Sequence, residues 1–490
     1  MDELKNRKKN LIMYPLGTVG RDMMYYLFTS CIITFVLFTR SLTDAQFAAI
    51  TAIVVAARVF DALNDPIMGN IIERTRTRWG KFKPWLVIGM VSSCIVVYLA
   101  FNTDLQGWSF VWFFGVVYFL YSITYTMHDI SYWGMVPSLS SEADTRNMFT
   151  SRATLCAGIG GTLASVLIPM FTVGDMAIGG SAKTAYGIIA LIVCIIAPLF
   201  LCFTVFGVRE NRDYTEAPPI SFRKIIRTIG GNKQLLWISV IFLIQQIGNG
   251  FIVGGIGPTY IYFDFGYNGG LVSLFSIIGM SATAFLMIFY PAISRKINRK
   301  PLMKQMLMIS LIGYAILLLA GLLLPSTMLK FWAIVLGYML SNFGQYSYYL
   351  VMMISIMNTV EYNEYTTGER DEAIVASMRP FLTKMSSALI VLITNASYLI
   401  FGVTKYTNQI SEFENKCQMG AISESEKLNA ISGVISSVSD SQALGLLLCM
   451  AILPCAFMVV SYLLYVKHYK LDEDEYDRIC KEIEAKKAKV

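Results

Sequence analysis

The sequence predicts an all-α membrane protein with twelve transmembrane helices arranged in two six-helix halves. Of its 490 residues, 55% are hydrophobic and only 15% are charged, and the mean hydropathy is +0.55. Water-soluble domains carry about 25% charged residues. The apolar residues also recur in runs of about 20, the length that spans a bilayer as a helix.

The apolar runs give six expected spans before a polar segment in the middle of the chain and six after it. They cover residues 22–39, 45–72, 84–101, 108–137, 150–173, 184–208, 236–263, 269–291, 302–324, 330–358, 373–402 and 442–466. The segment from Met1 to Lys5 is charged and lacks the features of a signal peptide, so we expect the first helix itself to direct insertion.

Lysine and arginine concentrate in alternate loops, which predicts the orientation of the chain in the membrane. The basic loops are 73–83, 209–235 and 294–304. Because basic residues are retained on the cytoplasmic side, we expect these loops and both termini in the cytoplasm of a multi-pass cell-membrane protein. The net charge of +7 follows from this topology, so no nucleic-acid partner is expected.

The polar segment with Pro218 and Pro219 divides the chain. We expect an N-terminal six-helix bundle over 1–208, a cytoplasmic linker over 209–235, a C-terminal six-helix bundle over 236–466 and a cytoplasmic tail over 467–490. The basic loop after the second span has a counterpart after the eighth, which indicates a duplicated bundle.

Two polar segments lie outside the expected spans. Residues 403–441 are rich in Ser, Asn and Glu, and this composition fits either a partly ordered extracellular cap or a flexible connector. Residues 471–490 alternate acidic and basic side chains at helical spacing, which predicts a short solvated helix.

Cysteine and histidine usage argues against a zinc site. The nine cysteines and two histidines form no disulfide pattern and no zinc-binding spacing. We therefore expect no cofactor and no catalytic residues, and the lipid bilayer and a small solute as the partners of a monomer.

Carboxylates inside the apolar spans are the strongest functional signal. Each costs about 2.5 to 3.5 kcal/mol at mid-membrane, so each needs a partner. Asp61, Asn64 and Asp65 share one helical face, and two like charges this close favour a bound cation or proton. The alternative is that these acids pair with basic side chains and hold helices together. Asp22 and Asp129 are the other acids in or beside spans.

Other polar residues of the spans fall near these acids or carry compensating charge. Thr126 and Trp133 share a face with Asp129, and they offer a hydroxyl oxygen and an aromatic wall on which a sugar stacks. Packing is the alternative for Trp133, and for His128 we favour packing over a proton relay. Arg152 and Lys384 are the compensating bases, which leave the four acids in excess.

Two further features concern the second half. Arg379 is either a third cationic group of the cavity, which would suit a carboxylated sugar, or an interhelical residue. The seventh span contains Gln245, Gln246 and Asn249 followed by several glycines and Pro258, which predicts an interrupted helix that bends around a substrate. Close helix packing through the glycines is the alternative.

The sequence resembles the glycoside-pentoside-hexuronide:cation symporters, the melibiose permease group of the major facilitator superfamily. The most specific stretches are Asp61 to Gly69 (DALNDPIMG) and Arg74 to Trp85 (RTRTRWGKFKPW). Further agreement comes from residues in both halves of the chain: Gly20, Arg21, Asp22, Tyr125, Thr126, Asp129, Trp133, Arg152, Thr359 to Tyr362, Glu364 and Lys384.

The resemblance implies a role for each matching residue. The cation site would consist of Asp61, Asn64, Asp65, Thr126 and Asp129, with the three acids as ligands of a monovalent ion only. The sugar site would include Asp22, Asp129, Trp133 and Arg152, and we add Tyr349 and Arg379. Lys384 would be a charge partner between the two sites. The chain departs from the melibiose permease pattern at Arg21, Tyr349 and Arg379.

We therefore expect a secondary active transporter that carries a glycoside, pentoside or hexuronide together with Na⁺, Li⁺ or H⁺ by alternating access. A sugar sensor derived from a transporter and a membrane-embedded enzyme are the rival classes. A sensor would normally lose the cation cluster or gain a regulatory domain, and an enzyme would need a nucleophile with a base or a metal cluster.

Overall fold

The computed structural model describes residues 2–140, 142–210, 222–294 and 296–487. Within these ranges the chain folds into α-helices with short 3₁₀ and π segments and contains no strand. It divides into two compact units. The first unit comprises Met1–Ala217, Gly266–Leu274 and Tyr398–Val438, and the second comprises Pro218–Phe265, Phe275–Ser397 and Ser439–Val490.

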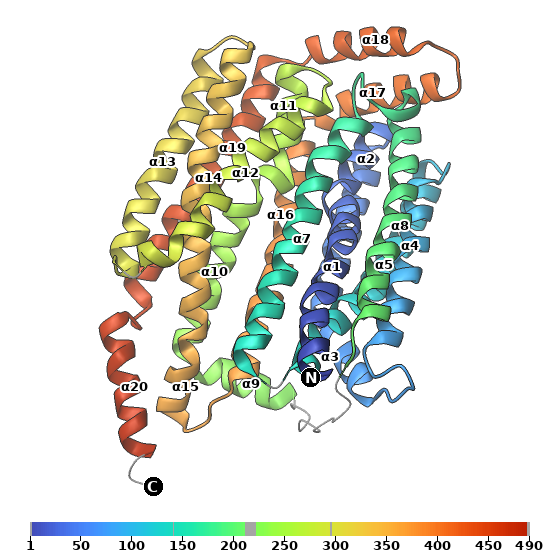
Figure 1. The fold of residues 1–490 in the computed structure, drawn as a ribbon. Coiled ribbons are helices and arrows are strands. Elements are labelled where there is room, and N and C mark those ends of the chain that lie inside the picture. Colours follow the sequence, from blue (N-terminus) through green and yellow to red (C-terminus); the bar gives the residue numbers. More distant parts are fainter. Residues whose placement is uncertain (1, 141, 211–221, 295, 488–490) are drawn as a thin grey trace. The chain divides into compact units, whose positions relative to one another are not determined.

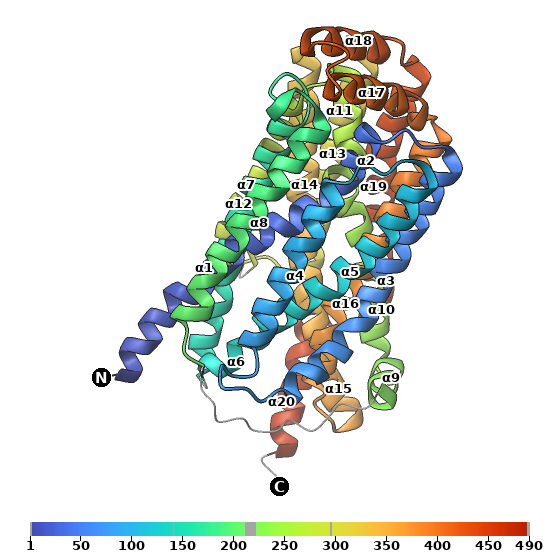
Figure 2. The same ribbon diagram turned by 90° about the vertical axis from the view of Figure 1, so that its right-hand side faces the viewer.

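The first unit is built mainly on long helices that pack side by side, with short helices between them. They are α1 (Asp2–Ser30), α2 (Ile32–Thr39), α3 (Asp44–Arg74), α4 (Lys83–Phe101), α5 (Gly107–Gly134), α6 (Val136–Leu139), α7 (Ala143–Thr172), η1 (Ile178–Gly180), α8 (Ala182–Gly207), α17 (Val403–Gln418) and α18 (Glu424–Ser436). Helix α1 packs against α7 and α8, and α5 packs against α3 and α4 (Figure 2).

The second unit is a similar bundle with short helices at one end. It contains α9 (Phe222–Gly231), α10 (Lys233–Gly250), η2 (Ile252–Ile256), α11 (Gly257–Phe265), most of α12 (Gly269–Ser294), α13 (Arg299–Leu323), α14 (Met328–Met357), α15 (Thr359–Thr367), nearly all of α16 (Glu372–Ile400), α19 (Asp440–His468) and α20 (Glu473–Lys487). Helix α13 packs against α14 and α19, and α10 packs against the same two helices (Figure 1).

The helices account for the twelve expected spans, although not all of them qualify individually. Eight described helices are long and apolar enough to cross a membrane, and two bent pairs raise this number to ten. Helices α12 and α14 occupy the remaining two expected spans. Many inward-facing positions of α14 are polar, for example Asn342, Gln345 and Ser347, which lowers its hydropathy.

The first helix begins much earlier than the sequence predicts. We expected a span from residue 22, but α1 runs from Asp2 to Ser30 through Pro15 and then bends by 46° into α2. The error arises because charged and polar residues dominate the first turns of α1. As a consequence, Arg21 lies well inside this helix. Gly20 allows α1 to approach α8 closely, since a Cβ at this position would lie 2.5 Å from the Cα of Ala197 on α8.

The predicted interruption of the seventh span is present. Helix α10 ends at Gly250, and α11 begins at Gly257 after a π-helical segment in which Gly255 leaves helical geometry. The two helices meet at an angle of 45°. Gln245 remains in the regular part of α10 and donates to the carbonyl oxygen of Gln345, 2.9 Å away.

Residues 403–441 form an ordered cap, which we define as α17 and α18, rather than a flexible connector. Hydrogen bonds attach α17 to the segment between α2 and α3: Asn408 exchanges bonds of 2.9 and 2.7 Å with the backbone of Leu42, and the Ser41 and Ser411 hydroxyls lie 2.9 Å apart. Although we expected this segment to belong to the C-terminal bundle, it packs with the first unit.

A buried ion pair anchors the cap to the start of α8. Glu414 and Lys427 are both fully buried and lie 3.5 Å apart. The Glu414 carboxylate accepts a 2.7 Å bond from the backbone nitrogen of Ala182, and Lys427 donates to the carbonyl oxygen of Gly180, 2.6 Å away. Burial raises the pKa of Glu414, and the Lys427 charge and the Ala182 bond oppose this shift.

Replacing Lys427 by methionine should therefore release the cap. Breaking a fully buried pair leaves one uncompensated charge and costs about 3 to 5 kcal/mol, so we expect amide hydrogen exchange in 403–436 to accelerate more than a hundredfold. Lys416→Met is the matched control, because Lys416 pairs with Glu412 on the exposed surface of α17 and such pairs contribute less than about 1 kcal/mol. Unchanged exchange in Lys427→Met would contradict the anchoring role.

The C-terminal tail helix is docked, not solvated as the sequence suggested. Helix α20 packs against α15, and Ile479 and Ile483 are buried in the core of the second unit. Arg299 binds Glu473 at 2.9 Å, and Lys300 binds Asp472 at the same distance. Because the two isoleucines stand one helical turn apart, they make one apolar stripe that charge alternation alone does not reveal.

Candidate functional site

Asp61 lies at the contact between α3 and α5. Its Oδ1 accepts a 3.0 Å bond from the Ser122 hydroxyl and a 2.7 Å bond from the Thr126 hydroxyl. Both hydroxyl residues are buried, whereas Asp61 is half-buried. The structure thus brings together Asp61 and Thr126, two of the expected cation ligands, and adds Ser122, which stands one helical turn before Thr126 on the same face of α5.

Asn64 and Asp65 follow Asp61 on α3, and both are half-buried. Leu63 and Ile67 of the same helix are 57% and 59% exposed, so α3 presents an apolar face outward and the three polar side chains on another face. This separation is the one expected of a helix that borders lipid on one side.

Arg21 on α1 joins two of the expected site residues. Its Nη2 lies 2.7 Å from Asp22 Oδ2, and its Nη1 lies 3.1 Å from Asp129 Oδ1. The arginine side chain is only 4% exposed, whereas those of Asp22 and Asp129 are 22% and 33% exposed. A guanidinium presents several donors in a fixed plane, which is why one side chain can serve two carboxylates from different helices.

The aromatic residues of α5 surround this guanidinium. Its central carbon lies 5.1 Å from the ring centre of Trp133 and 5.2 Å from that of Tyr132. Such cation–π contacts stabilise a desolvated arginine by about 2 kcal/mol. Arg21 therefore lies over a face of Trp133, the residue expected to stack on the sugar.

Arg58 is a second base near the acids, and it is half-buried. It lies on α3, one turn before Asp61, donates to the carbonyl oxygen of Thr29 at 3.4 Å, and interacts electrostatically with Tyr118 and Asp61. Neither Arg21 nor Arg58 is among the bases expected from the sequence, and the expected excess of acids over bases was therefore too large.

The cation site expected from Asp61, Asp65 and Asp129 stays a prediction. Among the residues that the structure describes, no three His, Cys, Asp or Glu side chains are grouped closely enough to hold a metal ion. Asp129 forms an ion pair with Arg21, and Asp61 accepts hydrogen bonds from two hydroxyls of α5. The Asp61 carboxylate and these two hydroxyls place three oxygen-bearing groups next to one another.

Arg152 and His128 make backbone contacts. Arg152 is exposed on α7 and donates to the carbonyl oxygen of Leu11, 3.2 Å away. His128 is fully buried, its Nδ1 lies 3.0 Å from the carbonyl oxygen of Leu86, and its ring stacks near Tyr132. The contacts of His128 fit the expected packing role better than a proton relay.

The expected site residues of the second half lie on α14 and α16. Arg379 is exposed, and its Nη2 donates to the Tyr349 hydroxyl at 2.9 Å. The structure thus brings together these two residues, which we expected at the sugar site. Lys384 is half-buried, five residues further along α16, and its role as a charge partner stays a prediction.

The motif residues of α15 belong to a charged network beside the tail helix. Arg370 binds Glu361 and Glu364 at 2.7 and 2.9 Å. In the neighbouring loop, Asp371 binds Lys224 of α9 at 2.8 Å. Partial burial would raise the pKa of Asp371, but the bonds from Lys224 and Thr228 outweigh it and hold the pKa below its usual value.

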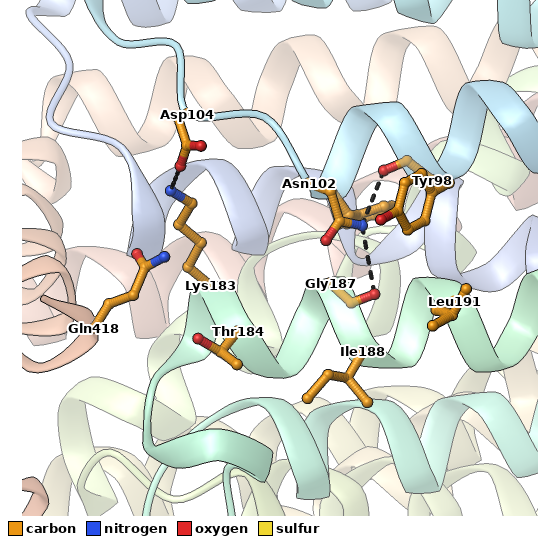
Figure 3. Close-up of a pocket in the computed structure, with 10 residues that line it drawn as sticks. Tyr98, Asn102, Asp104, Lys183, Thr184, Gly187, Ile188, Leu191 and Gln418 are labelled. Atoms are coloured by element: carbon orange, nitrogen blue, oxygen red, sulfur yellow. Dashed lines mark hydrogen bonds and ion pairs between the residues drawn. The ribbon is translucent and has the colours of Figure 1, made fainter.

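The first unit also contains a surface cavity that includes none of the expected site residues. Two adjoining hollows of about 310 and 490 Å³ share Asp104, Lys183 and Gln418, and we call them together the Lys183 cavity. The smaller hollow lies between the ends of α4 and α8 (Figure 3). Lys183 forms an ion pair with Asp104, and Asn102 donates to the carbonyl oxygens of Tyr98 and Gly187.

The long apolar helices, with ion pairs between some of them, are those of a multi-pass membrane protein. The fold is similar to the crystal structure of a bacterial homologue of the human lysosomal transporter Spinster, with a TM-score of 0.60 over 95% of this chain and 98% of that one at 13% identity. This likeness concerns the fold alone.

A family model described as MFS/sugar transport protein matches residues 13–473. The chain belongs to this family and, within it, to the glycoside-pentoside-hexuronide:cation symporters of the major facilitator superfamily.

Two curated relatives illustrate the family. The chain is 29% identical to the lactose permease of Leuconostoc lactis over 408 residues, 78% of this chain and 61% of the permease. It therefore matches about three-fifths of that permease's length. It is 24% identical to the glucuronide carrier protein homolog of Escherichia coli (strain K12) over 98% of this chain and 96% of the relative.

Proposed function

We propose that the protein is a secondary active transporter that carries a glycoside, pentoside or hexuronide together with one monovalent cation. The observation that supports this most strongly is the pairing of charges inside the first unit, where Arg21 joins Asp22 and Asp129 and two hydroxyls hold Asp61. Membership of the family also supports the proposed class of solute and its coupling to a cation.

The charge balance of the first unit favours a single cation. Its intramembrane acids are Asp22, Asp61, Asp65 and Asp129, and its intramembrane bases are Arg21, Arg58 and Arg152. One negative charge remains, and one monovalent cation neutralises it. Since an uncompensated charge is expensive in a low-dielectric environment, cation entry stabilises the bundle.

We place the cation at Asp61. A sodium or lithium ion would take the carboxylate oxygen of Asp61 and the hydroxyl oxygens of Ser122 and Thr126, whose hydrogens would rotate away from the ion. A proton would instead reside on Asp61 itself. Asn64 and Asp65, on the same face of α3, complete the expected ligand set.

We place the sugar at Asp22, Asp129 and Trp133. In the structure, Arg21 binds both of these carboxylates. Sugar hydroxyls would compete with the guanidinium for the two carboxylates, while Trp133 supplies an apolar wall. Asp129 lies on α5, one turn after Thr126, so the helix that carries cation ligands also carries a sugar ligand. Coupling is then reciprocal: each solute raises the affinity for the other by the same factor.

The proposed orientation follows the positive charges, with the basic loops and both termini in the cytoplasm of the cell membrane. The chain would transport as a monomer by alternating access of its two halves.

Uptake into proteoliposomes tests the function. Labelled lactose, an α-galactoside, a β-glucuronide and a pentoside would be offered while sodium and pH gradients are imposed separately. We expect at least one of the sugars to accumulate above its outside concentration with one cation gradient and only equilibrate without it. Binding of sugar without accumulation under either gradient would instead favour a sensor derived from a transporter.

Thr126→Val separates the two kinds of cation. The valine removes a hydroxyl ligand but leaves the Asp61 carboxylate that a proton needs. If sodium is the coupling ion, we expect the sodium concentration for half-maximal uptake to rise about tenfold, which corresponds to one lost bond to a charged group. If the proton is the coupling ion, uptake should stay independent of the sodium concentration in both the wild-type protein and the variant.

Arg379→Gln tests the carboxylate hypothesis for the sugar. A guanidinium binds a carboxylate through two parallel bonds, so we expect β-glucuronide uptake to fall about tenfold relative to uptake of a neutral glycoside. Tyr349→Phe is the companion variant, because it removes the 2.9 Å partner of Arg379 without removing the charge. Equal losses for both sugars would show that Arg379 has an interhelical role.

A further inference from the structure

The Lys183 cavity is rich in groups that both donate and accept hydrogen bonds. Apart from the Asp104–Lys183 ion pair, its polar side chains are amides and hydroxyls, chiefly Asn102, Gln106, Asn415 and Gln418. Figure 3 shows the Gln418 amide beside Lys183 and the ring of Tyr98 at the other end of the hollow. The cavity therefore combines amide pairs, a neutralised ion pair and an aromatic ring.

Buried charges hold the walls of this cavity in place. Fully buried Arg40 donates to the carbonyl oxygen of Thr103 at 2.6 Å and lies 4.9 Å from the ring centre of Phe110, which fixes the segment that carries Asp104. On the opposite wall, buried Glu414 precedes Asn415 and binds the backbone of Ala182, next to Lys183. These contacts fix the backbone segments that carry Asp104, Lys183 and Asn415, which reduces the entropic cost of ordering them when a ligand binds.

The charge of the cavity points to a neutral ligand. The charge of Lys183 is balanced by Asp104, so the net charge of the cavity favours neither an anion nor a cation. A polyhydroxylated neutral molecule needs no net charge, because each hydroxyl donates and accepts as the amides do. The volumes of about 310 and 490 Å³ fall within the range of roughly 300 to 1,000 Å³ for small-molecule sites.

We propose that the Lys183 cavity is a second binding site for neutral glycosides, separate from the site at Asp22 and Asp129. The cap contributes one wall of this site, which gives residues 403–441 a function. The inference rests on the proposed sugar transport and its orientation: α4 starts at the basic loop and ends at Phe101, so the cavity faces the outside and receives sugar before the transport site does.

The direct test counts sugar molecules bound per chain. Equilibrium dialysis of the full-length protein with labelled lactose should show two sites, one weaker than the other. The double variant Asn415→Ala/Gln418→Ala should weaken the second site at least about tenfold, since two neutral hydrogen-bonding groups are lost. Glu412→Ala/Lys416→Ala is the matched control, because it removes two exposed side chains of α17 that do not line the cavity.

A variant in a loop outside the cap distinguishes loss of sugar binding from misfolding of the cap. Gln106→Ala alters the opposite wall, in an exposed segment, and should weaken the same site. In the double variant, unchanged hydrogen exchange over 403–436 would show that the cap is still docked. One sugar per wild-type chain, or equal isotherms for the double variant and its control, would overturn the proposal.

Transport measurements distinguish this inference from the proposed function. At low sugar concentration the double variant should take up lactose several-fold more slowly, whereas the rate at saturating sugar should stay unchanged. Normal uptake with a single binding site would reject only the second site. Absence of coupled uptake in the wild-type protein would reject the proposed function on which it rests.

Discussion

Replacing Asp61 by asparagine is expected to abolish cation-driven accumulation of sugar, so that inside and outside concentrations become equal. The asparagine keeps an oxygen for the Ser122 and Thr126 hydroxyls, which now donate at 3.0 and 2.7 Å. It removes the negative charge that binds the cation. We expect cation affinity to fall at least about thirtyfold, which corresponds to roughly 2 kcal/mol, a modest value because Asp61 is only half-buried.

The measurement is the accumulation ratio of labelled sugar in proteoliposomes under an imposed cation gradient, together with sugar exchange across the membrane at equilibrium. Asp61→Asn should keep exchange while it loses accumulation, since downhill movement needs no coupling. Asp175→Asn is the control, because it makes the same chemical change at an exposed loop carboxylate of the same unit. Full accumulation by Asp61→Asn would show that the coupling ion binds elsewhere.

The features predicted correctly from the sequence are those with strong local signals. Long apolar runs give the helices because a spanning segment must satisfy its own backbone hydrogen bonds, and the glycines from 250 to 257 give the break between α10 and α11. The contact between Thr126 and Asp61 agrees with the helical periodicity around Asp129 and with the resemblance. The role of Thr126 as a cation ligand stays a prediction.

The features missed from the sequence depend on contacts between distant segments. The first span was expected to begin at residue 22, and Arg21 was not among the expected compensating bases, although it lies inside α1 and binds two acids. The sequence did contain an indication of this role, since an arginine directly before an intramembrane aspartate is itself a candidate partner for that acid. The docking of the cap could not be predicted, because Glu414 and Lys427 look like ordinary surface charges until the chain folds.

Replacing Arg21 by methionine is expected to abolish sugar uptake and to destabilise the first unit. The substitution keeps an apolar stem but leaves Asp22 and Asp129 without the guanidinium that now joins them. Breaking a buried ion pair costs about 3 to 5 kcal/mol, and we expect the lower end because both carboxylates are partly exposed. Thermal unfolding in detergent measures this change, and initial uptake measures the functional one.

Two further substitutions separate charge from geometry at Arg21. Arg7 lies on α1 like Arg21, but it is exposed, and its Nη1 lies 3.0 Å from Glu142 Oε2. Arg7→Met should therefore cost less than about 1 kcal/mol. Arg21→Lys restores a positive charge but not the planar fork, so we expect most of the stability to return while uptake stays reduced, because one ammonium group cannot hold both carboxylates in the same geometry. If Arg21→Met transported at the wild-type rate, the link between Asp22 and Asp129 would have no part in sugar binding.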